Sequence, residues 1–285
     1  MEEVSNQNWS FIIRSKTSLL DLNLKELLNY KFLIRMFILR DFTAVYKQTI
    51  LGPIWYIVQP LLTTIVYALI FKRVPQMSSE GQPKLLFYMS GLLLWNYFAT
   101  NLMKNSETFY INAHVFGKVY FPRLTVPIAT TISGLLALFF QLILLLCTYL
   151  YYVYLGVPVH IQITILLFPY LLFLVCLLSM SLGIIVSSLT IKYRDLKHLV
   201  NFGIQLAMWV TPVLYPMSQF SGTWLNKMIR LNPLSSILET FRYSLFGSGS
   251  LPWIDILYSS ICTFVILILG IIIFNKTEKY FIDNI

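Results

Sequence analysis

Two sets of polar and aromatic residues recur at helical spacing within apolar stretches of the sequence. One set lies between positions 56 and 67, and the other lies between positions 201 and 215. Residues three or four apart share one face of an α-helix, so each set predicts a polar stripe along one helix. Amides, hydroxyls and aromatic rings can hydrogen-bond or stack with an uncharged ligand, whereas a proton relay would need ionisable side chains. The stripes consist of Tyr56, Gln59, Thr63 and Tyr67, and of Asn201, Gln205, Met208 and Tyr215.

The sequence contains no pattern of catalytic, nucleotide-binding or metal-binding residues. It has no GxxxxGK[ST] phosphate loop and no GxSxG nucleophile turn. His114, His160 and His198 lie far apart, without acidic or thiol partners at the spacing of metal ligands. The three cysteines lie separately within apolar runs, which predicts buried thiols rather than disulfides. We therefore expect no catalytic site, no metal site and no cofactor in this chain.

Composition predicts that the elements carrying these residues lie in a membrane. Hydrophobic residues make up 57% of the 285 residues and charged residues only 12%, against about 25% charged in ordinary soluble domains. The net charge of +9 raises the possibility of nucleic-acid binding. However, the basic residues flank apolar segments instead of forming one compact face, which favours membrane topology and anionic lipid over nucleic acid.

The apolar segments predict an all-α, polytopic membrane protein with six transmembrane helices. The clearest sign is the stretch between Arg123 and Lys192, which contains no Asp, Glu, Lys or Arg. As a single helix it would be on the order of 100 Å long, about three hydrocarbon cores, so it must fold back. Residues 156–160 (GVPVH) supply the glycine and proline for that turn. The predicted spans are about 53–71, 85–103, 126–152, 163–191, 199–216 and 254–274.

Residues 1–50 are predicted to form a cytoplasmic tail and an amphipathic interface helix, with residues 51–285 forming the transmembrane domain. Leucines oppose polar residues over positions 22–29, after which Lys31 and Arg35 fall on the leucine stripe. A helix at the membrane interface tolerates this pattern because long basic side chains reach the headgroups. An ordinary cytosolic helix is the alternative.

The stretch between spans five and six, residues 218–252, predicts a pair of re-entrant helices. Its apolar runs are too short to cross a membrane and too apolar for a plain loop. Gly247 and Gly249 supply the exit turn.

Six spans place both termini on one side of the membrane. Fifteen basic residues fall on the side of the termini and six on the other. The excess of Lys and Arg on the cytoplasmic side of membrane proteins therefore predicts that both termini are cytoplasmic.

Several motifs occur in one order along residues 25–275, and together they resemble ABC-2 type permeases that export O-antigen, capsule or teichoic acid. No single motif is decisive, but their order on a six-span frame is specific. One departure is His114, where a second asparagine is expected. The motifs are residues 39–55 (LRDFTAVYKQTILGPIW), 59–61 (QPL), 91–96 (GLLLWN), 118–123 (KVYFPR), 192–198 (KYRDLKH), 211–215 (TPVLY) and 231–234 (LNPL).

The resemblance implies a homodimeric permease of the bacterial inner membrane, paired with two copies of a separate ATPase that binds the ATP and Mg²⁺. It also implies a polysaccharide carried on undecaprenyl diphosphate or another lipid, and a channel at the dimer seam lined by the two polar stripes. The loop after span two would contact the ATPase. The residues expected there are Lys104, Glu107, Lys118, Tyr120 and Arg123.

Arg40 and Lys47 lie just before the first span, and we hypothesise that they attract the diphosphate of the carrier. Binding of lipid headgroups is the alternative role for these two residues. Polar stripes can also act as interhelical contacts rather than as a channel lining. For the whole chain, the alternatives are an exporter of drugs or small lipids and, from another class, a membrane-embedded transferase.

Overall fold

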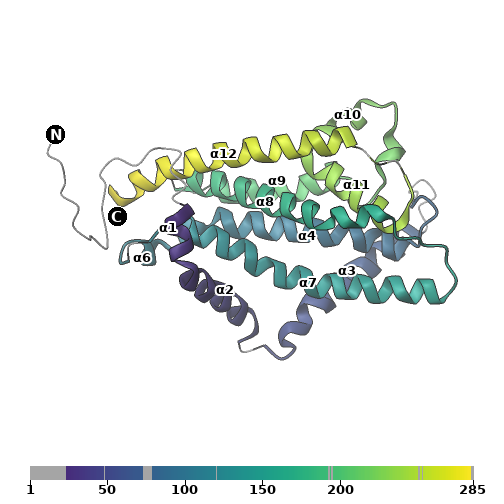
Figure 1. The fold of residues 1–285 in the computed structure, drawn as a ribbon, viewed down its shortest axis with the longest axis horizontal. Coiled ribbons are helices and arrows are strands. Elements are labelled where there is room, and N and C mark those ends of the chain that lie inside the picture. Colours follow the sequence, from purple (N-terminus) through teal and green to yellow (C-terminus); the bar gives the residue numbers. More distant parts are fainter. Residues whose placement is uncertain are drawn as a thin grey trace.

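The predicted all-α class is confirmed. The computed structural model describes residues 24–47, 49–72, 79–119, 121–191, 193, 195–249, 251 and 253–283, and these residues form helices and no strands (Figure 1). In chain order the elements are α1 (Leu24–Asn29), α2 (Lys31–Tyr46), η1 (Gly52–Ile54), α3 (Trp55–Lys72), α4 (Lys84–Ser106), α5 (Thr108–Ile111), α6 (Ala113–Phe116), α7 (Thr125–Tyr154), η2 (Ile163–Leu167), α8 (Phe168–Thr190), α9 (Leu196–Val210), η3 (Met217–Phe220), α10 (Trp224–Leu231), α11 (Pro233–Phe246) and α12 (Trp253–Asp283).

Four helical segments within the described residues are long and apolar enough to cross a membrane, so the chain is a multi-pass membrane protein. They are Gly52–Phe71, Thr125–Tyr154, Ile163–Thr190 and Trp253–Thr277. The helices at the second and fifth predicted spans do not meet this criterion, each for a different physical reason. Helix α4 has 23 residues but carries several polar ones, while α9 has 15 residues and is about 22 Å long.

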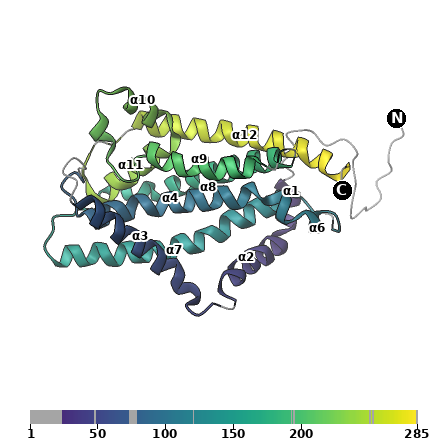
Figure 2. The same ribbon diagram turned by 180° about the vertical axis from the view of Figure 1, so that it is seen from behind.

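Helix α4 forms the centre of the bundle. Most of its residues are buried, and it contacts α3, α7 and α8, while α12 lies along α8 (Figure 2). A helix enclosed by other helices can carry polar groups that would lack hydrogen-bond partners in lipid. This position explains how α4 keeps its asparagines inside an apolar bundle.

Helices α2 and α3 form a V that points away from the bundle, with its vertex in the segment that joins them, which contains η1 (Figures 1 and 2). The V leaves one side of α3 apart from its neighbours. Helix α3 continues through Pro60, whose carbonyl accepts a hydrogen bond from Thr64 Oγ1 at 2.7 Å.

The N-terminal helices pack one face against the end of the bundle. Leu27 and Phe37 are buried, and the Phe37 ring lies 5.9 Å from the ring of Phe121. The opposite face of these two helices exposes large apolar side chains at a spacing of four residues, as an interface helix would. Placement of this face at the membrane surface stays a prediction. The exposed residues are Leu28, Phe32 and Met36.

The turn between the third and fourth predicted spans begins at the predicted residues, 156–160. Helix α7 ends at Tyr154, and Gly156 has a φ of +78°. The hydroxyl of Tyr149 donates to the carbonyl of Val159 at 3.0 Å and ties the returning chain to α7. Gly247 and Gly249 both have positive φ angles, as residues in a turn do, and their role as the exit from a re-entrant pair stays a prediction.

A buried arginine fixes the chain after α9 to α11. Arg242 is 4% exposed, and its guanidinium donates to the carbonyls of Pro212, Val213 and Tyr215. The same guanidinium lies 3.9 Å from the ring centroid of Phe87 on α4. These contacts hold α11 against α4 and against the chain segment that follows α9.

Candidate functional site

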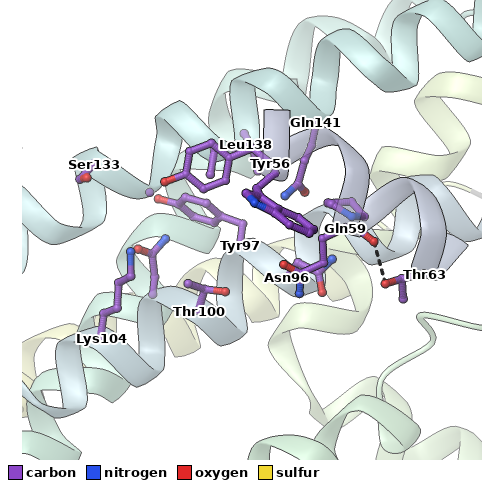
Figure 3. Close-up of a pocket in the computed structure, with 15 residues that line it drawn as sticks. Tyr56, Gln59, Thr63, Asn96, Tyr97, Thr100, Lys104, Ser133, Leu138 and Gln141 are labelled. Carbon is purple, nitrogen blue, oxygen red and sulfur yellow. Dashed lines mark hydrogen bonds between the residues drawn. The ribbon is translucent and has the colours of Figure 1, made fainter. Parts of the chain in front are cut away.

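A polar groove of about 410 Å³ lies between α3, α4 and α7 (Figure 3). The predicted stripe on α3 supplies three of its side chains, together with the exposed ring of Trp55 at the start of that helix. The labelled lining residues are Tyr56, Gln59 and Thr63 from α3, Asn96, Tyr97, Thr100 and Lys104 from α4, and Ser133, Leu138 and Gln141 from α7.

Two amide side chains in the groove have unused hydrogen-bonding atoms. Asn101 is 1% exposed, and neither its amide nitrogen nor its amide oxygen has a hydrogen-bond partner among the described residues. The amide oxygen of Gln141 is also buried without a partner in the described part of the chain. Buried polar groups are normally paired, so these atoms point to a ligand or water that supplies both donors and acceptors.

The neighbours of Asn101 hold its side chain at the groove wall. A Cβ atom at Gly134 would lie 2.5 Å from the Asn101 amide oxygen, so the glycine leaves the room that this side chain fills. Tyr97 is fixed separately, because its hydroxyl donates to the carbonyl of Thr131 at 3.1 Å. One face of α4 therefore presents both a fixed aromatic ring and an unpaired amide.

Tyr67, the last residue of the predicted α3 stripe, does not line the groove. Its ring stacks against Phe71 at 6.1 Å, and Tyr67 packs against the hydrophobic core. By contrast, the ring of Tyr56 stacks against Phe140 of α7 at 6.2 Å while Tyr56 still lines the groove.

The second predicted stripe does not join the first within one copy of the chain. On α9, Asn201 and Gln205 are exposed, whereas Met208 is half-buried against the core. Tyr215 is buried, and its hydroxyl donates to the carbonyls of Trp209 and Val210 at 2.9 and 3.1 Å. The role of these residues in a channel between two copies stays a prediction.

The two basic residues before the first span differ in their surroundings. Arg40 pairs with Asp41 at 2.8 Å and donates to the side-chain oxygen of Asn112 at 3.4 Å. Lys47 is exposed at the end of α2. Their role toward a phosphate group stays a prediction.

The residues predicted to contact an ATPase spread along the end of the bundle that carries α1 and α2. Lys104 and Lys118 are exposed, and Glu107 pairs with Lys197 at 2.5 Å. Arg123 is 6% exposed, and its guanidinium lies 5.4 Å from the ring of Phe116. Tyr120 lies outside the described residues.

A second pocket of about 490 Å³ lies beside the pair of Glu107 and Lys197, where α5 meets α8 and α9. The Glu107 carboxylate raises the pKa of the Lys197 ammonium above its ordinary value, first through their hydrogen bond and then through charge. The pair therefore joins the loop after α4 to the start of α9.

Sequence reasoning missed Asn101, Gln141 and Arg242 as site or anchoring residues. A signal was present for the groove, since Asn96, Thr100 and Lys104 recur every four residues on α4. No sequence pattern revealed that Arg242 would meet carbonyls about thirty residues away.

Comparison with known proteins identifies the family of the chain. Residues 33–246 match the family described as ABC-2 type transporter. The chain is 30% identical to an O-antigen export system permease protein RfbA of Klebsiella pneumoniae over 93% of this chain and 99% of that protein. It is 26% identical to the RfbA permease of Myxococcus xanthus, with 92% and 98% covered. It is also 23% identical to the capsule polysaccharide export inner-membrane protein CtrC of Neisseria meningitidis, with 90% and 95% covered. The chain therefore belongs to the ABC-2 type transporter family.

Proposed function

We propose that this chain is the membrane-spanning subunit of an ABC transporter that exports lipid-linked polysaccharide across the bacterial inner membrane. The observation that carries the proposal is the similarity to O-antigen export permeases, which extends over 93% of this chain and 99% of the relative. The transporter contains two copies of this chain and two copies of a separate ATPase, which binds the ATP and Mg²⁺. This chain supplies the path through the membrane and has no catalytic site of its own.

The proposed topology has six spans and two cytoplasmic termini. Helices α4 and α9 complete the set of spans, with α4 shielded from lipid by its neighbours and α9 extended by residues 211–216. Helices α10 and α11 are the re-entrant pair at the outer side. Two features support this arrangement: α1 and the end of α12 lie at the same end of the bundle, and the basic residues are concentrated on that side (Figure 1).

The groove between α3, α4 and α7 suits a glycan because its groups are polar, aromatic and mostly uncharged. Sugars present hydroxyl groups that both donate and accept, as the unpaired amide of Asn101 requires. They also present C–H faces that pack on rings such as those of Trp55 and Tyr56. The stripe on α9 lies on the other wall of a path that two copies of the chain enclose.

The ATPase docks at the end of the bundle where α5 meets the start of α9. The pocket of about 490 Å³ exposes Tyr110 and Lys197 there, and the ion pair with Glu107 joins two segments of the chain. A movement transmitted to the loop after α4 would reach the groove directly, because Lys104 lines the groove.

The carrier diphosphate meets Arg40 and Lys47 on its way into the membrane. The pair with Asp41 leaves the Arg40 side chain 45% exposed, so the guanidinium remains accessible to a phosphate. The charge reversals Arg40→Glu and Lys47→Glu together should reduce export while insertion into the membrane stays intact. Normal export by the double variant would reject this role.

The test of the proposed function is co-purification with an ATPase, followed by measurement of ATP hydrolysis. The complex should hydrolyse ATP faster when lipid-linked polysaccharide is added. A drug or small lipid that stimulates hydrolysis when polysaccharide does not would identify the alternative exporter. A purified chain that modifies a lipid without any ATPase would identify a transferase.

A further inference from the structure

The groove between α3, α4 and α7 carries a positive charge at one end. Lys104 lies in the last turn of α4 and is the only charged side chain among the described residues that line the groove. Asn96, Thr100 and Lys104 follow one another along the same side of α4 (Figure 3). At a helical rise of about 1.5 Å per residue this row is about 12 Å long, so the charge stands at the end of an otherwise uncharged groove.

The ammonium group of Lys104 has no carboxylate partner in the described part of the chain. The next acidic residue along the sequence is Glu107, and it pairs with Lys197 at 2.5 Å. Arg40 differs from Lys104 in this respect, because it pairs with Asp41 at 2.8 Å. An anion can therefore approach Lys104 without displacing a carboxylate.

A buried hydrogen-bond donor lies three residues before Lys104 on the same helix. Asn101 is 1% exposed, lines the same groove, and its amide nitrogen has no hydrogen-bond partner among the described residues. Residues three apart on a helix have Cβ atoms about 5–6 Å from each other. An ammonium and an amide at this separation can donate to oxygens of one phosphate group, and the amide oxygen can still accept from a sugar hydroxyl.

An exposed apolar stripe of α7 flanks the groove at the level of these donors. A Cβ atom at Gly134 would lie 2.5 Å from the Asn101 amide oxygen, so this part of α7 is level with Asn101. Next to the groove-lining residues Ser133 and Ala137, α7 exposes large apolar side chains at helical spacing. Side chains of this kind on a membrane-spanning helix contact lipid chains. The stripe consists of Ile132, Leu136, Phe139 and Ile143.

We propose that Lys104 and Asn101 bind the phosphate of the lipid carrier, and that the apolar chain of the carrier lies along the α7 stripe. This inference rests on the proposed function and names the part of the substrate that this end of the groove holds. Arg40 and Lys47 attract the carrier at the membrane surface, and Lys104 holds it in the groove. The sugar linked to the phosphate lies against the uncharged groove residues.

The charge of the ligand favours the carrier over an ordinary membrane lipid. A diphosphate carries more negative charge than the phosphodiester of a phospholipid, so its attraction to the uncompensated Lys104 ammonium is stronger. The role also differs from the ATPase contact that the sequence predicts for Lys104. Under the proposed topology Lys104 lies at the cytoplasmic end of α4, where a carrier loaded with sugar arrives.

The test is titration of the full-length chain, purified in detergent, with undecaprenyl diphosphate, followed by native mass spectrometry. We expect saturable binding of this probe at concentrations at which undecaprenol, which lacks the phosphates, does not bind. Lys104→Gln should raise the dissociation constant about tenfold, near the lower limit for a hydrogen bond to a charged group, because Lys104 is exposed to solvent. Asn101→Leu should raise it about two- to tenfold.

Two matched variants separate a specific site from general surface charge. Lys104→Arg keeps the positive charge and should bind the diphosphate like the wild type. Lys118→Gln removes an exposed lysine at the same end of the bundle, outside the groove, and should leave the dissociation constant unchanged. Added NaCl should weaken binding to the wild type more than binding to Lys104→Gln, because salt screens the charge that the variant lacks.

Wild-type affinity in Lys104→Gln would overturn the proposal. Displacement of the diphosphate by an equal concentration of phosphatidylglycerol would also overturn it, because the site would then belong to membrane lipid. The titration contains no ATPase and no transport step. A failure of binding would therefore leave the export function to its own assay of ATP hydrolysis, and a failed export assay would leave the phosphate site standing.

Discussion

Asn101 offers a substitution whose effects on stability and on export should have opposite signs. Its side chain is 1% exposed, lines the groove and has no hydrogen-bond partner among the described residues. An unpaired buried polar group lowers the stability of the folded state by about 1–3 kcal/mol. Asn101→Leu removes this group and should therefore raise the free energy of unfolding by at most about 3 kcal/mol. If the amide hydrogen-bonds a sugar during export, losing that bond removes about 0.5–1.5 kcal/mol, or about two- to tenfold in rate.

Asn105 provides the matched control on the same helix, one turn away. It is also fully buried, but its amide nitrogen donates to Oγ1 of Thr131 at 3.2 Å, so that only its amide oxygen lacks a partner among the described residues, and it does not line the groove. Asn105→Leu should therefore lower the melting temperature of the purified chain and leave export per folded molecule unchanged. Thermal unfolding in detergent and quantification of surface polysaccharide at equal expression measure the two effects. If Asn101→Leu destabilised the chain as much as Asn105→Leu, or exported normally, the ligand-binding role of Asn101 would be wrong.

Three other predictions concern the ends of the bundle. Gly91→Ala should destabilise the chain by about 1–3 kcal/mol in thermal unfolding, because the added methyl group overlaps the guanidinium of Arg242. Wild-type stability of this variant would show that the Arg242 side chain can move aside without loss of its contacts. Glu107→Gln removes the charged partner of Lys197. It should lower substrate-stimulated ATP hydrolysis and hardly change the melting temperature of the isolated chain. Unchanged ATP hydrolysis would show that this ion pair takes no part in the contact with the ATPase. Burial raises the pKa of the Glu239 carboxyl group. The folded state therefore binds this proton more tightly than the unfolded state does. The free energy of unfolding should fall as pH rises from the ordinary carboxyl pKa through the higher pKa of the folded state. This pH dependence should be weaker in Glu239→Gln, and equal slopes for the two proteins would contradict it.

The sequence was informative where a physical constraint acts along the chain. The uncharged stretch between Arg123 and Lys192 had to fold back because no bilayer is thick enough for it, and the turn lies at Gly156 as predicted. The helical spacing of Tyr56, Gln59 and Thr63 likewise predicted a shared face, and all three line the groove.

Contacts between distant segments could not be predicted in this way. Asn101 and Gln141 lie 40 residues apart, and only the packing of α4 against α7 brings them to one groove. The pairing of Glu80 with Ser218 spans 138 residues. Periodicity identifies the face of a helix but not the neighbour of that face, so the contacts of Arg242 became visible only in three dimensions.

The most direct test of the export function is to remove the gene for this chain from its cells and follow the lipid-linked polysaccharide. We predict that the polysaccharide disappears from the cell surface and accumulates on its lipid carrier inside the inner membrane, and that the wild-type chain restores the surface material. Normal surface polysaccharide without this chain, and without internal accumulation, would contradict the assignment.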